Sequence, residues 1–413
     1  MKNKLVWIVG VAVLLRVVLS AVTYHSDVVP FVFAGKVIAS GHVLDFYDYL
    51  WNLPEGHVVL ETYPRNLFNY PPMVYFGLGG ISILTTLFLG ELVNRFIFAT
   101  PTALGTSNVY LLLFLLKLPY FLVDSLCAYF VWNLFKKRKN RILALFLWLF
   151  NPVNLYATYM MGQFDIIPVM FVLWVMYRVR QMRNRESGLL KEAILLGLGA
   201  SFKIYPLLFL IPLAATQKGL WKRVKIIALG LSTYLATIAP FLFSVGFRRT
   251  ALVAGQTMKS FYANLPISGG ETIIIYLALL GFVYLVFWMK GIRIVNLWRA
   301  FFIVMLLFFT FTHYHPQWFL WLTPFLLVDL VLSKFRHYPL VIISLISMFS
   351  LVLFFDAGLS VGLFSAVNPK LYNLPLLFGG QIDYNLARSF LHTLFVSASI
   401  YYGHDQLKRL LHV

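Results

Sequence analysis

Long apolar runs, separated by short basic segments, make up most of this chain of 413 residues. Apolar residues account for 60% of it and charged residues for 12%, so a water-soluble fold would expose more apolar surface than water tolerates. A transmembrane helix needs roughly 20 apolar residues, whereas a strand of a membrane β-barrel shows about 10 residues of alternating polarity. The continuous runs therefore predict an all-α polytopic membrane protein with about 12 (roughly 11 to 13) transmembrane helices.

The basic segments set the expected orientation in the membrane. The net charge of +19 comes from Lys and Arg clustered between apolar runs, where cytoplasmic loops usually carry them. We therefore take the charge as a sign of topology and expect no nucleic-acid partner. With both termini inside, spans are predicted near residues 5–23, 109–134, 141–158, 165–180, 191–202, 204–216, 223–243, 272–290, 299–312, 317–333, 338–355 and 386–403.

A single integral membrane domain, 1–413, follows from this scheme. Its parts are an extracytoplasmic first loop with interfacial helices (24–108), a central helical bundle (109–335) and C-terminal helices (336–413). The apolar run 72–90 is expected to be an interfacial or re-entrant helix, because counting it as a span would put the basic segment 136–141 outside. Its glycines weaken a helix, which is tolerated where protein or a cavity covers the backbone.

Several kinds of chemistry lack their sequence signature. The chain has no Walker motif, GxGxxG fingerprint, HExxH motif or nucleophile elbow. Its one cysteine, Cys127, lies in an apolar run and provides neither a disulfide nor a pair of metal ligands. ATP hydrolysis, zinc proteolysis and redox chemistry are therefore not expected. Acidic residues gather on the predicted external side, so any chemistry is expected there.

Asp27 follows the external end of the first predicted helix by about one turn. A carboxylate fixed to a rigid element and reachable from water suits a general base that takes a proton from an attacking hydroxyl. The same position suits an ordinary helix cap, since Ser26 and Asp27 precede the apolar segment that begins at Val28. The residues alone leave both roles open.

Gln163 and Asp165 lie in the apolar stretch YMMGQFDIIPVMF, where a carboxylate at membrane depth is expensive. The predicted topology places them at an external turn, facing a cavity at the membrane surface. Asp165 suits a cap for the following helix, and both side chains suit contacts with sugar hydroxyls. Tyr70, followed by two prolines, predicts a rigid turn whose aromatic ring can stack on a sugar or a prenyl chain.

Cations on the same face are candidate ligands for a lipid phosphate. Lys203 lies in a short external hairpin between two apolar runs, and no nearby acid is expected to pair with it, which favours phosphate binding over snorkelling to the interface. Arg65, His313 and His315 are further candidates. A spacing of two puts the histidines on different sides of a helix, which favours binding a phosphate or an acceptor over binding a metal. No metal site is predicted.

Two charged residues, Asp124 and Lys117, lie inside a predicted span. They are expected to pair with polar groups of the bundle.

Several short motifs follow one another in an order that is similar to a known superfamily. FVFAGKVIASGHVLDFYD, FNYPPM, NPVNLYATYMMGQFDIIPVMFVL, GASFKIYPLLFLIPL and HYHPQWFLWLTPFLL together resemble the GT-C membrane glycosyltransferases that use polyprenyl-phosphate sugars. Prokaryotic polyprenyl-phosphate-mannose-dependent mannosyltransferases and the catalytic subunit of GPI mannosyltransferase I are the nearest likenesses, over most of residues 1–335. The resemblance implies that the acid of the first loop, Asp27, is the catalytic base. Many relatives have two acids close together there, whereas the next acids here are Asp45 and Asp48, whose help to Asp27 or to acceptor placement stays open.

The expected function is inverting transfer of a hexose, mannose by resemblance, from a polyprenyl-phosphate donor to an acceptor hydroxyl outside the cytoplasm. The acceptor is a glycolipid, a glycan or a protein. No cofactor is obligatory, because the donor is already activated, and the resemblance leaves a divalent metal open. A transporter or flippase for a lipid-linked sugar or anionic solute is the alternative, and a noncatalytic scaffold is a third. Compact size favours a prokaryotic plasma membrane over the endoplasmic reticulum.

Overall fold

The computed structural model describes residues 2–182, 189–252, 255–313, 315–379 and 381–411. Over these residues the chain is almost entirely helical, and its one small sheet is an antiparallel hairpin of β1 (Asn264–Ser268) and β2 (Glu271–Ile274). The helices are α1 (Lys2–Val22), α2 (Val28–Ala39), α3 (Phe46–Trp51), α4 (Val58–Thr62), α5 (Pro72–Phe98), α6 (Thr100–Leu104), α7 (Val109–Asn133), α8 (Arg138–Leu149), α9 (Pro152–Asn154), α10 (Ile166–Gln181), α11 (Leu190–Ala200), α12 (Leu210–Ala214), α13 (Leu220–Ile238), α14 (Val245–Phe247), α15 (Gly255–Met258), α16 (Ile275–Lys290), α17 (Leu297–Phe311), α18 (Thr323–Leu332), α19 (Tyr338–Val352) and α20 (Tyr384–Leu411).

The helices identify an all-α membrane protein. Among the described residues, six helical stretches are long and apolar enough to cross a bilayer. Most other predicted spans form shorter helices, and the run 272–290 begins as strand β2 before α16 starts. The total of about 12 crossings therefore stays a prediction. The six stretches are Lys4–Val22, Pro72–Phe98, Val109–Asn133, Arg138–Met160, Leu220–Phe241 and Ile294–Phe311.

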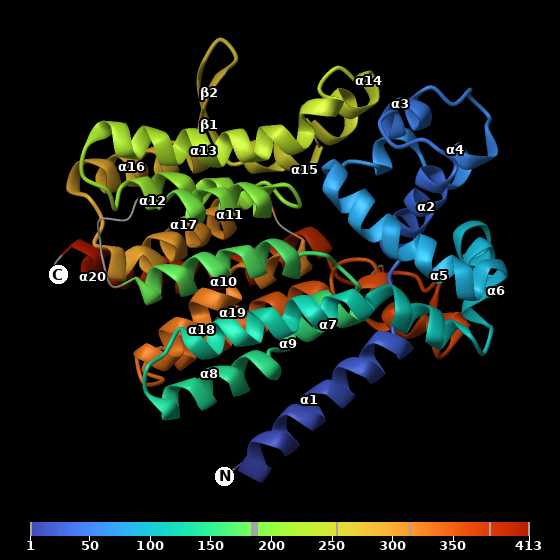
Figure 1. Cartoon of the computed structure of the whole chain (residues 1–413), viewed down its shortest axis with the longest axis horizontal. Coiled ribbons are helices and arrows are strands. Elements are labelled where there is room, and N and C mark those ends of the chain that lie inside the picture. Colours follow the sequence, from blue (N-terminus) through green and yellow to red (C-terminus); the bar gives the residue numbers. More distant parts are fainter. Residues whose placement is uncertain (1, 183–188, 253–254, 314, 380, 412–413) are drawn as a thin grey trace.

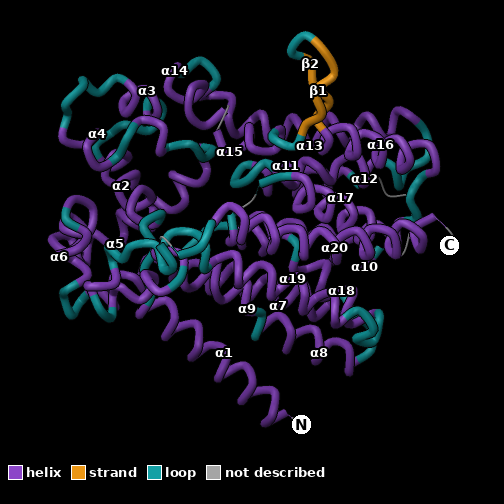
Figure 2. The backbone as a smooth tube through the Cα atoms, turned by 180° about the vertical axis from the view of Figure 1, so that it is seen from behind, coloured by secondary structure: helices purple, strands orange, loops and turns teal. Residues whose placement is uncertain are grey.

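Two parts of the molecule are distinct in Figures 1 and 2. Helices such as α7, α10, α13, α17 and α20 run in broadly similar directions and form the main bundle, while α2 to α6 and α14 gather at one end of it. Helix α1 leaves the bundle at an angle, and the hairpin β1–β2 projects from it. The C-terminus lies at the end opposite to α2–α6.

Helix α5 contains residues 72–90. It runs for 27 residues with a kink at Leu89, and its length and composition are sufficient to cross a bilayer, so the expected interfacial or re-entrant placement stays a prediction. Its glycines serve packing: a Cβ on Gly35 of α2 would lie 2.5 Å from the carbonyl oxygen of Gly79. Eight of the twelve residues of α2 are buried, so this helix packs inside the protein and does not lie on the bilayer as an amphipathic helix.

A buried polar cluster joins α1, α7 and α8, as expected for Asp124. The Asp124 carboxylate accepts hydrogen bonds from Arg16 Nε (2.7 Å), Trp148 Nε1 (2.7 Å), Asn154 Nδ2 (3.0 Å) and the Tyr159 hydroxyl (2.7 Å). Every donor is inside the protein, and this satisfies a carboxylate that would otherwise be costly at this depth. The cluster is structural.

Lys117 of α7 holds the end of α1. Its ammonium donates to the carbonyl oxygens of Thr23 (2.7 Å) and Tyr159 (2.9 Å), and it lies 3.2 Å from that of Ser20. The last carbonyls of a helix lack partners within the helix, and a cation at this end also interacts favourably with the negative end of the helix dipole. The predicted pairing of Lys117 with polar groups of the bundle is therefore confirmed.

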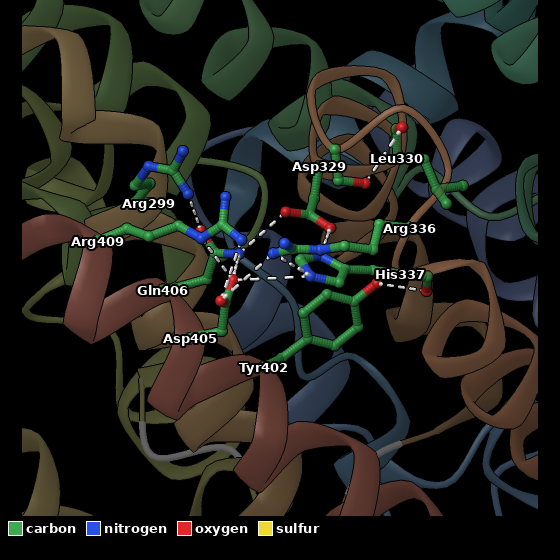
Figure 3. A network of polar contacts seen from close by, with 10 residues as sticks. Arg299, Asp329, Leu330, Arg336, His337, Tyr402, Asp405, Gln406 and Arg409 are labelled. Atoms are coloured by element: carbon green, nitrogen blue, oxygen red, sulfur yellow. Dashed lines mark hydrogen bonds and ion pairs between the residues drawn. The ribbon is translucent and has the colours of Figure 1, made fainter.

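A second network ties α17, α18 and α20 together at the other end of the bundle (Figure 3). The Asp329 carboxylate lies 2.7 Å from His337 Nδ1 and accepts from Gln406 Nε2 at 3.0 Å, while Arg299 donates to Gln406 Oε1. Asp405 pairs with Arg409 at 2.8 Å. These contacts fix the C-terminal part of α20 against the bundle.

Candidate functional site

Asp27 lies at the N-terminus of α2 and lines a cavity of about 260 Å³. Its side chain is 40% exposed, which keeps the carboxylate in contact with water. Although Asp27 occupies the N-cap position, its side chain makes no capping hydrogen bond. The capping role that the sequence left open is therefore absent, and the carboxylate is available for contacts inside the cavity.

Gln163 holds one oxygen of Asp27. The segment η2 (Leu155–Met160) ends just before Gly162, whose φ of +70° turns the chain towards α2. A Cβ at this glycine would lie 2.9 Å from Val28 and 3.1 Å from Lys117, so the tight turn needs glycine. Gln163 is fully buried, and its Nε2 donates to Asp27 Oδ2 at 2.7 Å. The bond orients the carboxylate, and no hydrogen bond from the described residues reaches Oδ1.

His25 completes the immediate surroundings of Asp27. Its Nδ1 accepts a hydrogen bond from the Asp27 backbone amide at 3.2 Å and lies 3.6 Å from Asp27 Oδ2. The imidazole therefore supports the turn after α1.

Lys203 has an acidic partner, contrary to the expectation from sequence. Its ammonium lies 3.0 Å from Asp165 Oδ1 and 3.3 Å from Oδ2, and Trp321 Nε1 donates to Oδ1 at 2.7 Å. Asp165 is fully buried and occupies the N-cap position of α10 without a capping hydrogen bond. The expectation failed because these residues are 38 positions apart and meet only in the folded bundle.

Four aromatic rings enclose the Lys203 ammonium. Their centroids lie 5.0 to 5.4 Å from Nζ, within the range of cation–π attraction, and they belong to Tyr70, Phe164, Trp318 and Trp321. Burial lowers the pKa of Lys203, and the Asp165 carboxylate opposes that shift. Lys203 is 7% exposed and does not line the Asp27 cavity.

The polar walls of the cavity include residues that the sequence did not single out. Gln317 Oε1 and Trp318 Nε1 are buried and have no hydrogen-bond partner within the described part of the chain. Unpaired polar atoms next to a cavity suit a ligand rich in hydroxyl groups. The motif HYHPQWF contains both residues and was the available signal. The other polar residues that line the cavity and were missed are His25, Ser26, Asn69 and Asp356.

A second cavity of about 440 Å³ adjoins the first. The two cavities share His25, Ser26 and Asp356 as wall residues. Asp356 follows α19, far from Asp27 in sequence, and its loop reaches the site only through the fold. The base candidate Asp27 lines the first cavity, and the second lies on the other side of wall residues that the two share.

Gln163, Asp165 and Tyr70 differ in how they meet the cavity. Gln163 and Asp165 are fully buried and do not line either cavity, although they were expected to face one. Tyr70 does line the first cavity, and burial together with the charges of Asp27 and Asp165 raises the pKa of its hydroxyl. Their predicted contacts with sugar stay predictions.

The remaining candidates of the first loop make structural contacts. Arg65 donates from Nε to the carbonyl oxygen of Trp51 at 2.9 Å, and Asp45 lies 2.7 Å from His42 Nδ1 at the surface. Asp48 Oδ1 accepts from the backbone amide of Gly246 at 2.9 Å and ties α3 to α14. None of these three residues lines either cavity.

His313 and His315 lie between α17 and the 3-10 helix η8 (Pro316–Trp321). Their ring centroids are 5.6 Å apart, and His315 lines the Asp27 cavity. Burial and the nearby charge of Lys259 lower the pKa of each imidazole to about 4. Both rings are therefore neutral near pH 7 and can donate an N–H group to a ligand.

One curated protein gives a functional comparison. A stretch of 127 residues is 27% identical to GPI mannosyltransferase 1 of Eremothecium gossypii, and it covers 30% of this chain and 30% of that protein. The chain thus matches less than a third of the length of this relative. No family model and no solved structure matches the chain.

Proposed function

We propose that the chain is a hexosyltransferase of the mannosyltransferase type, which moves one sugar from a polyprenyl phosphate to an acceptor hydroxyl on the extracytoplasmic side of the membrane. The partial exposure of Asp27 in its cavity, with one oxygen held by Gln163, is the observation that carries this proposal. The similarity to GPI mannosyltransferase 1 supports the kind of reaction.

The proposed reaction needs one base. The acceptor oxygen attacks the anomeric carbon while the bond from that carbon to the phosphate oxygen breaks, and the electron pair leaves with the polyprenyl phosphate. Asp27 Oδ1 takes the acceptor proton, and the attack from the opposite face inverts the anomeric centre. The donor is already activated, so the proposal requires no nucleotide.

The charged side chains inside the bundle that could bind a solute in transit, Arg16, Asp124 and Lys117, already have hydrogen-bond partners within the protein. A transporter places exposed ionisable groups near the midplane. Arg16 and Asp124 instead bond to each other, and Lys117 bonds to backbone carbonyls. These contacts favour the transferase over the transporter.

The test is sugar transfer by purified protein in lipid, with polyprenyl-phosphate-mannose and membrane-lipid acceptors. Asp27→Asn keeps the shape of the side chain but removes the base, so we expect a loss of about 10² to 10⁴ in kcat with donor binding retained. Asp45→Asn is the matched control, because Asp45 pairs with His42 at the surface, and we expect wild-type transfer from it. Full activity of Asp27→Asn would contradict the role of Asp27, and movement of the donor lipid without transfer would favour the transporter.

A further inference from the structure

Phe355, in the loop after α19, is bordered by three basic side chains from two separate segments, the connection between α17 and η8 and helix α20. The ring centroids of His313 and His315 each lie 6.4 Å from that of Phe355, and the Arg388 guanidinium carbon lies 5.1 Å from it. His313 follows α17, His315 precedes η8 and Arg388 lies in the second turn of α20. The fold therefore brings three groups that can donate to an anion to one place.

Helix α20 is fixed in this position by a second contact. His392 Nε2 lies 3.1 Å from the carbonyl oxygen of Thr310, in the last turn of α17. Residues four apart share one face of a helix, so His392 holds the face that carries Arg388 against the end of α17. Arg388 is half-buried and bonds within its own helix, to Tyr384 O at 3.2 Å and Asn385 Oδ1 at 2.6 Å. Its remaining N–H groups are available to a ligand.

Positive charge accumulates here, beside a cavity that the carboxylates of Asp27 and Asp356 also line. Lys259, Arg388 and His392 all lower the pKa of His313, which shows that they act on one small region. Within the described residues, neither Lys259 nor Arg388 forms an ion pair with an acid. A bound anion would balance these charges and accept their hydrogen bonds.

The cationic region adjoins the cavity of Asp27. His315 and Phe355 line that cavity. His313 and Arg388 do not line it, but His313 lies next to both of these residues and Arg388 lies over the Phe355 ring. At about 260 Å³ the cavity is smaller than the sites of drug-sized ligands, which suits one sugar ring. A sugar in the cavity would place the group attached to its anomeric carbon near these basic residues.

We propose that Arg388, His313 and His315 bind the phosphate group of a prenyl phosphate at the edge of the Asp27 cavity. This inference rests on the proposed transferase function, since it assigns the residues that hold the leaving phosphate. The planar guanidinium fits two phosphate oxygens, and the neutral imidazoles each donate one N–H group. Lys203, by contrast, is already paired with Asp165 and enclosed by aromatic rings.

Binding of farnesyl phosphate to the full-length protein in detergent tests the site without requiring sugar transfer. Farnesol measures the contribution of the chain alone, and competition by inorganic phosphate separates a site for free phosphate from one for a lipid-borne phosphate. We expect Arg388→Gln to weaken farnesyl phosphate binding about ten- to hundredfold, because a charged hydrogen bond contributes about 1.5 to 3 kcal/mol. We expect His313→Gln to weaken it less. Arg95→Gln should bind nearly as the wild type does, because Arg95 is paired with Glu91 at the surface.

The outcomes separate this site from the proposed reaction. Loss of binding in Arg388→Gln, with farnesol unaffected, supports the phosphate site whether or not inorganic phosphate competes. Wild-type affinity in both Arg388→Gln and His313→Gln overturns it. Protein that binds farnesyl phosphate through Arg388 but transfers no sugar keeps this site and rejects the transferase. Protein that transfers sugar normally with Arg388→Gln keeps the transferase and rejects the site.

Discussion

Asp124 and Asp27 contact the same segment of the chain but have opposite surroundings. Asp124 accepts four side-chain hydrogen bonds, two of them from Asn154 and Tyr159, and its side chain is 4% exposed. Asp27 accepts one such bond among the described residues, from Gln163, and is 40% exposed beside a cavity. A carboxylate with all its lone pairs used stabilises the bundle, whereas one with an open oxygen can still accept a proton.

The largest expected effect comes from Asp124. Asp124→Asn leaves the Arg16 guanidinium buried without its counter-charge, which costs about 3 to 5 kcal/mol for a buried pair. We expect the free energy of unfolding in mixed detergent to fall by that amount, and transfer to fall only with the folded fraction. Asp45→Asn, at the surface, should change it by less than about 0.5 kcal/mol. A stable Asp124→Asn protein without activity would show that Asp124 takes part in the chemistry and would remove the contrast.

Gln163 tests the other side of the comparison. Gln163→Leu removes the donor to Asp27 Oδ2, and a hydrogen bond to a charged group contributes about 1.5 to 3 kcal/mol, so kcat should fall roughly ten- to hundredfold. Because Gln163 does not line the cavity, the KM for the donor should stay near the wild-type value. Gln181→Leu, at an exposed glutamine, is the control. An equal change in KM with kcat intact would indicate that Gln163 binds substrate and does not position the base.

The sequence predicted the structure best where the signal was local. Hydropathy located most helices, and the helix end before Asp27 placed an acid next to water. Contacts between distant residues could not be read in this way: Arg16 meets Asp124 across 108 positions, and Lys203 meets Asp165 across 38. The placement of α5 relative to the membrane stays a prediction, because it depends on which side the basic loops face. The packing does show that Gly79, expected to weaken the helix, allows α2 to approach.

The approach of α2 to α5 gives the next prediction. Gly35→Ala places a Cβ against the Gly79 carbonyl oxygen at 2.5 Å, so the helices must separate at a cost of about 1 to 3 kcal/mol. Asp27 lies at the N-terminus of α2, and we expect transfer to decrease as well. Gly80→Ala, where a Cβ meets nothing within 4 Å, should leave the free energy of unfolding unchanged or slightly raised by better helix propensity. A Gly35→Ala protein as stable as the control would mean that the two helices tolerate a wider spacing.

The smallest effect concerns pH, and it separates the cationic edge of the cavity from Asp27. Burial and nearby charge lower the pKa of His313 and His315 to about 4 in the folded protein, against an ordinary value of about 6.5. The unfolded chain therefore binds protons first, so the stability from these neutral rings is complete above about pH 6.5 and is lost as the pH falls towards about 4. We expect the thermal midpoint of His313→Gln to fall less than that of the wild type over this interval. His404→Gln, at an exposed histidine, should follow the wild type.

Farnesyl phosphate extends the same measurement to the cationic edge of the cavity. Burial and the charges of Lys259, Arg388 and His392 lower the pKa of His313, and a bound phosphate would balance those charges. Farnesyl phosphate should therefore reduce the fall in the thermal midpoint of the wild type at low pH, and a fall that farnesyl phosphate leaves unchanged would separate His313 from the phosphate site.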